Sequence, residues 1–171
     1  MTLPDSQLPQ IHLRPSELLI TQKPQWVITL LGSCVAVTMY NRRMALAAMC
    51  HGMLPKPRNG EAISETDDQR FRYLSLAIPA MSDRFRHAGI QPGQIEVKLF
   101  GGSNLINMAG APSNDIWIGS ANVALARTLL DERHLRIRAE NVGGTRGRKI
   151  LFNTQTGEVL HKHLRKSEGR P

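Results

Sequence analysis

The chain has 171 residues, a formal net charge of +8 and only 5% aromatic residues. This length is typical of one domain, and a domain of this size buries enough apolar surface to fold without a metal ion or a disulfide. Because the Lys and Arg residues are scattered and few rings are available to stack on bases, we expect no nucleic-acid ligand; the charge would instead attract an acidic protein partner.

Neither secretion nor membrane insertion is expected. No apolar run approaches the roughly 20 residues that a membrane-spanning helix requires. The N-terminus carries no secretory leader, and two cysteines, Cys34 and Cys50, fit a reducing compartment. The sequence therefore predicts a cytoplasmic protein.

The first part of the chain is predicted to be β-structure. Residues 1–10 contain two prolines and show no apolar period, so we expect a mobile tail there. The polar stretch 55–66 carries further turn-forming residues and predicts a surface loop. Between them, short apolar runs bounded by Pro, Gly and Asn predict strands at 18–21, 27–30, 33–40 and 44–51.

The rest of the chain alternates helices with strands. Apolar residues three and four apart predict a helix over 66–87, and Pro79 predicts either a bend near Ser75 or two shorter helices. A second helix is expected at 120–133, and the polar, basic residues 161–171 are expected to form a second mobile tail. Strands are expected at 95–100, 135–139, 149–153 and 158–160.

This order of elements predicts the fold class. Strands, a helix, a strand, a helix and further strands do not form a regular βαβ array. We therefore expect one α+β domain over residues 1–171, in which helices pack on a largely antiparallel sheet core.

Cys34 is the principal candidate for chemistry. It lies between Gly32-Ser33 and a β-branched run, where a loop enters a strand, and His51 follows 17 residues later. One strand, a tight turn at 41–43 and an antiparallel return fill that interval, so a hairpin would bring the two residues together as cross-strand neighbours. An imidazolium beside a thiol can hold it as a thiolate at neutral pH. The alternatives are a buried structural cysteine and an ordinary histidine at a strand end. Cys50 directly precedes His51 and, since successive strand side chains point to opposite faces, is expected to be a core residue.

Five motifs follow one another along the chain: TLLGSCV at 29–35, HGMLP at 51–55, FGG at 100–102, GSAN at 119–122 and NVGGTRGRK at 141–149. In this order they resemble the CheD family of chemoreceptor glutamine deamidases. The resemblance implies a cytoplasmic enzyme of bacterial chemotaxis that converts receptor glutamines to glutamates through a thioester on Cys34, with His51 moving the protons. It also implies a β-sandwich-like core flanked by helices.

Further site candidates follow from these motifs. Thr29 is the candidate third group, which would orient the imidazole, although it could simply be a β-branched strand residue. Gly32 allows a tight turn, so the amides of Ser33 and Cys34 could stabilise an oxyanion. Gly101 and Gly102 could line the cleft or only form a turn. Asn122 is expected at a helix start, where its chemistry suits a cap, and only the resemblance connects it with the site.

No metal or cofactor is expected, because no histidine stands near other ligands at metal-binding spacing. The expected partners are chemoreceptor cytoplasmic domains, whose Glu-rich helices suit the positive charge, and a CheC-type phosphatase. Methyl esters of glutamate could react by the same acyl chemistry. One alternative is a catalytically silent adaptor that binds these chemotaxis proteins. Another is a papain-like peptidase or a transglutaminase, but these usually place their histidine much farther along the chain.

Overall fold

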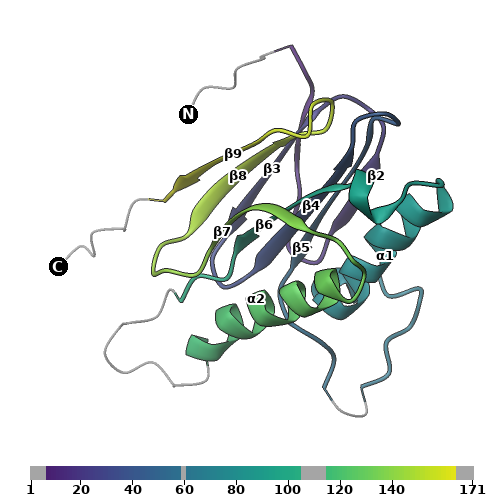
Figure 1. The fold of residues 1–171 in the computed structure, drawn as a ribbon. Coiled ribbons are helices and arrows are strands. Elements are labelled where there is room, and N and C mark those ends of the chain that lie inside the picture. The colour runs from purple at the N-terminus through teal and green to yellow at the C-terminus, as the bar shows by residue number, and fades with distance from the viewer. Residues whose placement is uncertain (1–6, 59–60, 105–114, 165–171) are drawn as a thin grey trace.

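The computed structural model describes residues 7–58, 61–104 and 115–164. Those residues form two β-sheets and two α-helices, with two short 3-10 turns (Figure 1). The strands are β1 (Gln10–His12), β2 (Leu18–Thr21), β3 (Trp26–Leu31), β4 (Val35–Asn41), β5 (Leu46–Gly52), β6 (Glu96–Gly101), β7 (Ile137–Val142), β8 (Arg148–Asn153) and β9 (Val159–His163). The helical elements are η1 (Arg70–Arg72), α1 (Leu74–His87), η2 (Pro92–Gln94) and α2 (Asp115–Asp131).

The two sheets are mostly antiparallel. The four-stranded sheet has the order β1-β3-β8-β9, and the five-stranded sheet has the order β2-β5-β4-β6-β7. Two pairs, β1 with β3 and β6 with β7, are parallel, while the other pairs in the two sheets are antiparallel. The predicted α+β class with a largely antiparallel core is confirmed.

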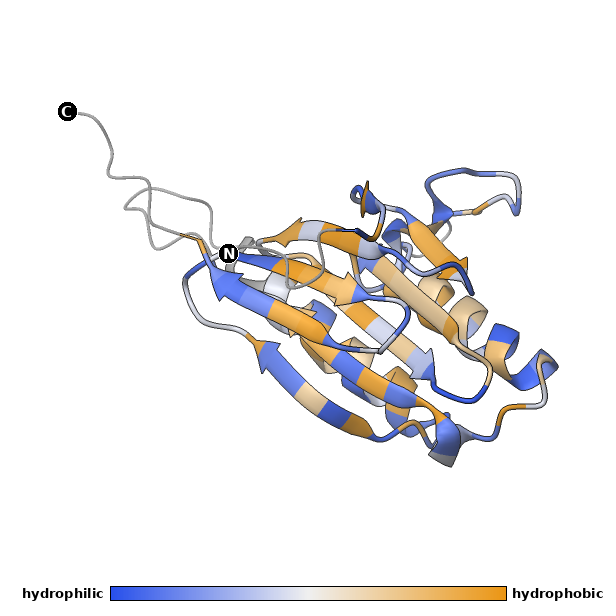
Figure 2. Cartoon of the chain, turned by 90° about the horizontal axis from the view of Figure 1, so that it is seen from above, coloured by the Kyte–Doolittle hydropathy of each residue, from blue (hydrophilic) through white to orange (hydrophobic). Residues whose placement is uncertain are grey.

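The molecule has three layers, and the five-stranded sheet is the middle one. Its inner face packs on the four-stranded sheet, and its other face, the helix face, is covered by α1 and α2 (Figure 1). Side chains alternate between these faces along β4, so that Val35 and Val37 contact the helix cluster while Ala36 lies between the sheets. Figure 2 shows apolar residues along the strands and helices, with polar residues between them on the outer strands and in many of the connecting loops.

The helix expected at 66–87 is interrupted, but not at Pro79. Pro79 lies inside α1, and the chain instead leaves the helical conformation at Tyr73, whose backbone is extended. The reason is tertiary: Tyr73 bridges Leu54, and the Leu74 amide donates to the Leu54 carbonyl at 3.0 Å. This pairing holds the segment that follows β5 against the start of α1.

Other boundaries also differ from the expectation, and the strand expected at 135–139 lies at Ile137–Val142. The second helix begins at Asp115 and ends at Asp131, rather than at 120 and 133. The expected tail 1–10 overlaps the first residue of β1, and the Trp26 amide donates to the Pro9 carbonyl at 2.8 Å. The expected tail 161–171 overlaps β9, which continues to His163 because it pairs with β8. The rest of both expected tails, 1–6 and 165–171, lies outside the described residues.

Neither helix in the described part of the chain has the length and apolarity needed to cross a membrane.

Candidate active site

Thr29 and His51 form a buried pair between the two sheets. Thr29 comes from β3 of the four-stranded sheet and His51 from β5 of the five-stranded sheet. The Thr29 hydroxyl oxygen lies 2.7 Å from His51 Nδ1, and the two residues are only 3% and 2% exposed. The sequence suggested Thr29 as the group that orients the imidazole, and the observed contact has the geometry for that role.

The hydrogen bonds of Thr29 determine the tautomer of His51. The Thr29 hydroxyl donates its single proton to the Leu13 carbonyl at 2.8 Å. It can therefore only accept from the ring, which places the ring proton on Nδ1 and leaves a lone pair on Nε2. Nε2 is buried and has no hydrogen-bond partner in the described part of the chain. In this orientation the imidazole has the geometry of a base whose Nε2 lone pair is available.

Cys34 lies on the same face as His51 but not directly opposite it. In the β4–β5 register Ala36 is the partner of His51. Cys34, two residues before Ala36, is therefore the diagonal neighbour, and its half-buried side chain packs against the cluster between the sheets. Diagonal neighbours are typically about 7–8 Å apart, against about 4.5–5.5 Å for direct pairs. The expectation of direct cross-strand pairing is corrected in this respect, because the strand pairing is shifted by two residues.

Cys34 and His51 are both uncharged at neutral pH. Burial raises the pKa of the Cys34 thiol above its ordinary value, and the residue's own backbone amide opposes this shift only in part. Burial lowers the pKa of His51, against smaller opposing effects of the Leu13 backbone and the Glu17 charge. Desolvation disfavours both charged forms, so burial opposes the thiolate–imidazolium pair that the sequence analysis expected.

The segment before β2 binds both the amide and the carbonyl group of the His51 backbone. The Ser16 amide donates to the His51 carbonyl, and the His51 amide donates to the Glu17 carbonyl, each at 3.0 Å. Ser16 has a φ of +72°, a conformation that non-glycine residues rarely adopt. The sequence analysis missed Leu13, Ser16 and Glu17. No motif marks them, because most of their contacts with Thr29 and His51 use backbone atoms.

Gly101 and Gly102 support the backbone of Cys34. The Gly102 amide donates to the Cys34 carbonyl, and the Ser103 amide donates to the Gly32 carbonyl, each at 2.8 Å. Gly101 has a φ of +112°, and a Cβ at this position would overlap the Cys34 carbonyl oxygen. The Gly102 amide is therefore occupied by Cys34 and is not free to bind an oxyanion.

Asn122 joins the two loops that carry the site. It is fully buried in the middle of α2 rather than at a helix start. Its Nδ2 donates to the Ser33 carbonyl at 3.0 Å and to the Met53 carbonyl at 2.9 Å. Both amide protons are thus used to hold the segments next to Cys34 and His51, so Asn122 acts on the backbone of the site.

Cys50 points away from this site, as the alternation of strand residues predicted. It is fully buried in the helix-face cluster, and burial raises the pKa of its thiol to about 11. Among residues 7–58, 61–104 and 115–164, no group of three His, Cys, Asp or Glu side chains could hold a metal ion.

Comparison with known proteins identifies the family. A family model described as CheD chemotactic sensory transduction matches residues 53–163. A protein of Geobacter sulfurreducens named probable chemoreceptor glutamine deamidase CheD 2 is 44% identical over 98% of this chain and 98% of its own. A protein of Oleidesulfovibrio alaskensis named probable chemoreceptor glutamine deamidase CheD is 40% identical over 95% of this chain and 76% of its own.

More remote matches are also found. A protein of Methanococcus maripaludis with the same CheD name is 31% identical over 88% of this chain and 92% of its own. The crystal structure of the hypothetical protein YfiH of Bacillus licheniformis is 15% identical over 72% of this chain and 49% of its own, with a TM-score of 0.44, which is too low to support an argument. The family model and the relatives with high identity over nearly the whole length are decisive: the chain belongs to the CheD family.

Proposed function

We propose that this protein is a cysteine-dependent glutaminase that converts selected glutamines of chemoreceptor cytoplasmic domains to glutamates. The relatives are named probable chemoreceptor glutamine deamidases. The observation that carries the assignment is the Thr29–His51 hydrogen bond, which leaves Nε2 as an unoccupied base on the face that also presents Cys34. One cytoplasmic domain of 171 residues would contain the whole activity.

In the first half of the reaction, the Cys34 sulfur attacks the side-chain carboxamide carbon of a receptor glutamine. Because the thiol and the imidazole are both neutral, His51 Nε2 takes the thiol proton as the new C–S bond forms. The tetrahedral intermediate then breaks its C–N bond, and His51 returns the proton to the departing nitrogen. Ammonia leaves, and a thioester joins the receptor to Cys34.

In the second half, His51 Nε2 takes a proton from water, and the resulting hydroxide adds to the thioester carbonyl. The C–S bond breaks, the sulfur recovers the proton from His51, and the receptor carries a glutamate. The Nδ1–H bond to Thr29 keeps Nδ1 protonated throughout both halves, so that only Nε2 gains and loses a proton. Attack by the same thiol on a glutamyl methyl ester would release methanol in place of ammonia.

The oxyanion of each tetrahedral intermediate requires donors that are not already occupied. The amides of Gly102 and Ser103 are hydrogen-bonded to carbonyl oxygens. We therefore assign the oxyanion to the amides of Ser33 and Cys34, which follow the turn at Gly32. Donors aimed at the developing charge are usually the largest contribution to this kind of catalysis.

The direct test is to incubate the protein with a receptor cytoplasmic fragment and to follow ammonia release together with the amide-to-acid mass change. We expect the wild-type protein to produce both signals and Cys34→Ala to produce neither. Full activity of Cys34→Ala would overturn the mechanism. Binding of the fragment by wild type without ammonia release would instead support a silent adaptor that binds receptors or a CheC-type phosphatase.

A further inference from the structure

Arg148, the first residue of β8, is a buried cation that the proposed chemistry does not use. It is 1% exposed. None of the ion pairs among the described residues includes it, and burial lowers the pKa of its guanidinium. Removing a charge from water without a counter-ion is costly, so proteins retain such a group mainly where its hydrogen bonds are needed.

The Arg148 guanidinium connects the two sheets. Nη1 donates to the Gly101 carbonyl at 2.5 Å, and Nη2 donates to the Gly143 carbonyl at 2.7 Å. Gly101 is the last residue of β6 in the five-stranded sheet, and Gly143 directly follows β7 of that sheet, whereas Arg148 belongs to the four-stranded sheet. The Gly101 carbonyl also accepts from the Gly143 amide at 2.9 Å, so the guanidinium and the β7–β8 connection both hold this carbonyl. Figure 1 shows the β7–β8 connection beside the end of β6. The planar guanidinium, with its several donors in a fixed geometry, can hold two such carbonyls at once.

The Gly101 carbonyl is one residue away from the contacts that hold Cys34. Gly101 pairs with Val35 in the β4–β6 register, and the neighbouring Gly102 amide donates to the Cys34 carbonyl. The absence of a side chain at Gly101 allows its backbone to lie directly against the Cys34 carbonyl oxygen. A shift of Gly101 would therefore shift Cys34.

Arg148 also reaches the site from its other side. In the β3–β8 register it is the partner of Leu31, the last strand residue before the Gly32-Ser33-Cys34 turn. The turn that carries Cys34 thus begins beside the Arg148 backbone and ends against the glycine that its guanidinium holds.

We infer that Arg148 is a positioning residue for Cys34: its guanidinium fixes Gly101, and Gly101 with Gly102 fixes the Cys34 backbone so that the thiol faces His51. The inference rests on the proposed function, because it takes Cys34 as the nucleophile. Displacement of a reacting group by about 1 Å typically costs on the order of 100-fold in rate.

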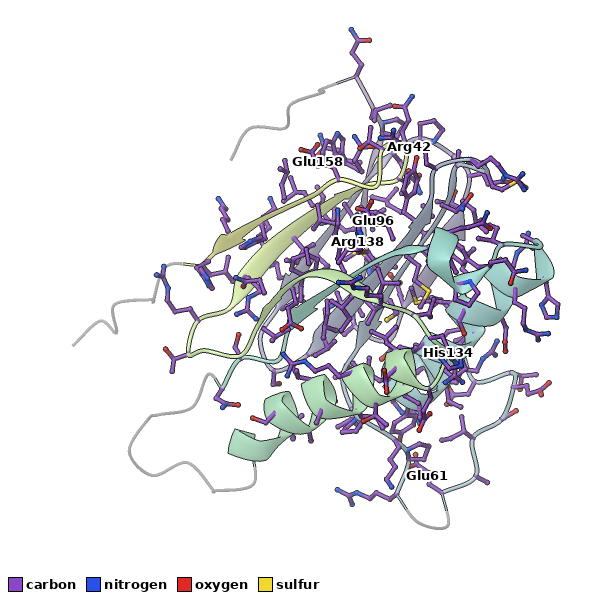
Figure 3. All side chains as sticks on the ribbon, viewed as in Figure 1. Arg42, Glu61, Glu96, His134, Arg138 and Glu158 are labelled. Atoms are coloured by element: carbon purple, nitrogen blue, oxygen red, sulfur yellow. The ribbon has the colours of Figure 1, made fainter. Side chains whose placement is uncertain are left out.

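Lys98 supplies the matched control. Its Nζ donates to the Gly157 carbonyl at 2.8 Å and pairs with Glu96 at 2.7 Å, so it too connects a cation of one sheet to a backbone carbonyl next to the other. Gly157 lies in the β8–β9 turn, at the end of β8 opposite to Arg148. Glu158 and Glu96, labelled in Figure 3, mark this region. Lys98→Met removes a similar bridge at a place that does not contact Cys34.

The experiment compares Arg148→Met, Arg148→Lys and Lys98→Met with wild type. We expect both Arg148 variants to lower kcat on a receptor fragment about 10- to 100-fold with little change in KM, because ground-state binding is retained. We also expect faster amide hydrogen exchange at Gly102, confined to the end of β6 and the start of β4. Lys98→Met should leave kcat and the exchange of Gly102 unchanged.

Several results would overturn the inference. These are wild-type kcat in Arg148→Lys, an equal loss of kcat in Lys98→Met, or lower kcat without faster exchange at Gly102. Failure of both Arg148 variants to fold would also overturn it, since the guanidinium would then be required for sheet packing as a whole. If wild type itself releases no ammonia, the proposed function fails, but the exchange measurement still decides whether Arg148 holds the Cys34 backbone.

Discussion

The two faces of the five-stranded sheet are built differently. The helix face is covered by a continuous apolar cluster that includes Val35, Cys50 and Leu74. The inner face also packs on an apolar cluster, but at one end it carries His51, which contacts the buried Thr29 of the four-stranded sheet. Arg148 lies on β8, the strand next to Thr29 in that sheet. Buried polar atoms without a hydrogen bond, such as His51 Nε2, cost about 1–3 kcal/mol each.

This difference assigns the stability of the fold mainly to the helix face and the chemistry to the inner face. The helix face can supply the apolar burial on which folding depends. The inner face can then keep an uncharged thiol and an unoccupied imidazole nitrogen, which are unfavourable in a core but useful in a reaction.

The two cysteines give the sharpest contrast, because each represents one face. Cys34→Ala should lower the rate of ammonia release by about 1,000-fold or more, since it removes the attacking atom. Cys50→Ala should keep the activity and lose about 1 kcal/mol of unfolding free energy, since it only removes a buried sulfur. Kinetic assays and urea unfolding of both variants measure these effects. Loss of activity in Cys50→Ala at full stability would contradict the division between the faces.

Two glycines test how closely the backbone encloses Cys34. Gly101→Ala should lower the free energy of unfolding by about 2–4 kcal/mol, because it combines a positive φ with overlap of the Cys34 carbonyl oxygen. Gly93→Ala is the control, since nothing lies within 4 Å of a Cβ there. Urea unfolding should show no more than about 0.5 kcal/mol of change for Gly93→Ala. Equal stability of the two variants would show that the Gly101 contact is not tight.

Thr29 tests the orientation of the imidazole. Thr29→Val keeps the shape of the side chain but removes the acceptor for His51 Nδ1–H, and we expect kcat to fall about 10- to 100-fold. Thr29→Ser retains the hydroxyl and should stay within a few-fold of wild type. Steady-state kinetics of the two variants decide the point. Wild-type kcat in Thr29→Val would mean that the imidazole does not depend on this bond.

The pH dependence of stability tests the burial of His51. The pKa of His51 is lowered in the folded state. Below the ordinary value of 6.5, the unfolded chain therefore binds a proton that the folded chain does not bind. The contribution of His51 to stability is therefore present above pH 6.5 and is lost as the pH falls toward the folded-state pKa. Urea unfolding between pH ~7.5 and ~5.5 should show a shallower loss in His51→Gln than in wild type. Parallel curves would contradict the assignment.

The local pattern of the sequence was sufficient to predict the β4–β5 hairpin and the face of the sheet on which Cys50 lies. Strand alternation and a turn at 41–43 determine both. The two-residue offset between Cys34 and His51 was not predicted, because register depends on how the strands and their neighbours pack rather than on loop length alone. Likewise, Tyr73 leaves the helix because of Leu54, which is distant in sequence.

The sequence contains a sign that Arg148 is unusual, but it does not show what Arg148 binds. It alternates with Ile150 and Phe152, both of which are fully buried, and this pattern places a charged residue on an inward position. The pattern could have marked Arg148 as unusual. Its acceptors, the carbonyls of Gly101 and Gly143, are visible only once the two sheets are assembled.

In the proposed mechanism the reaction passes through an acyl group on the Cys34 sulfur. Hydroxylamine, which reacts with thioesters, tests for this intermediate. Added to the assay, it should compete with water for the thioester, so that ammonia is still released while part of the receptor glutamine becomes a glutamyl hydroxamate. The hydroxamate should be absent with Cys34→Ala. Ammonia release that yields only glutamate at high hydroxylamine concentration, or hydroxamate formed equally by Cys34→Ala, would contradict a covalent intermediate on this residue.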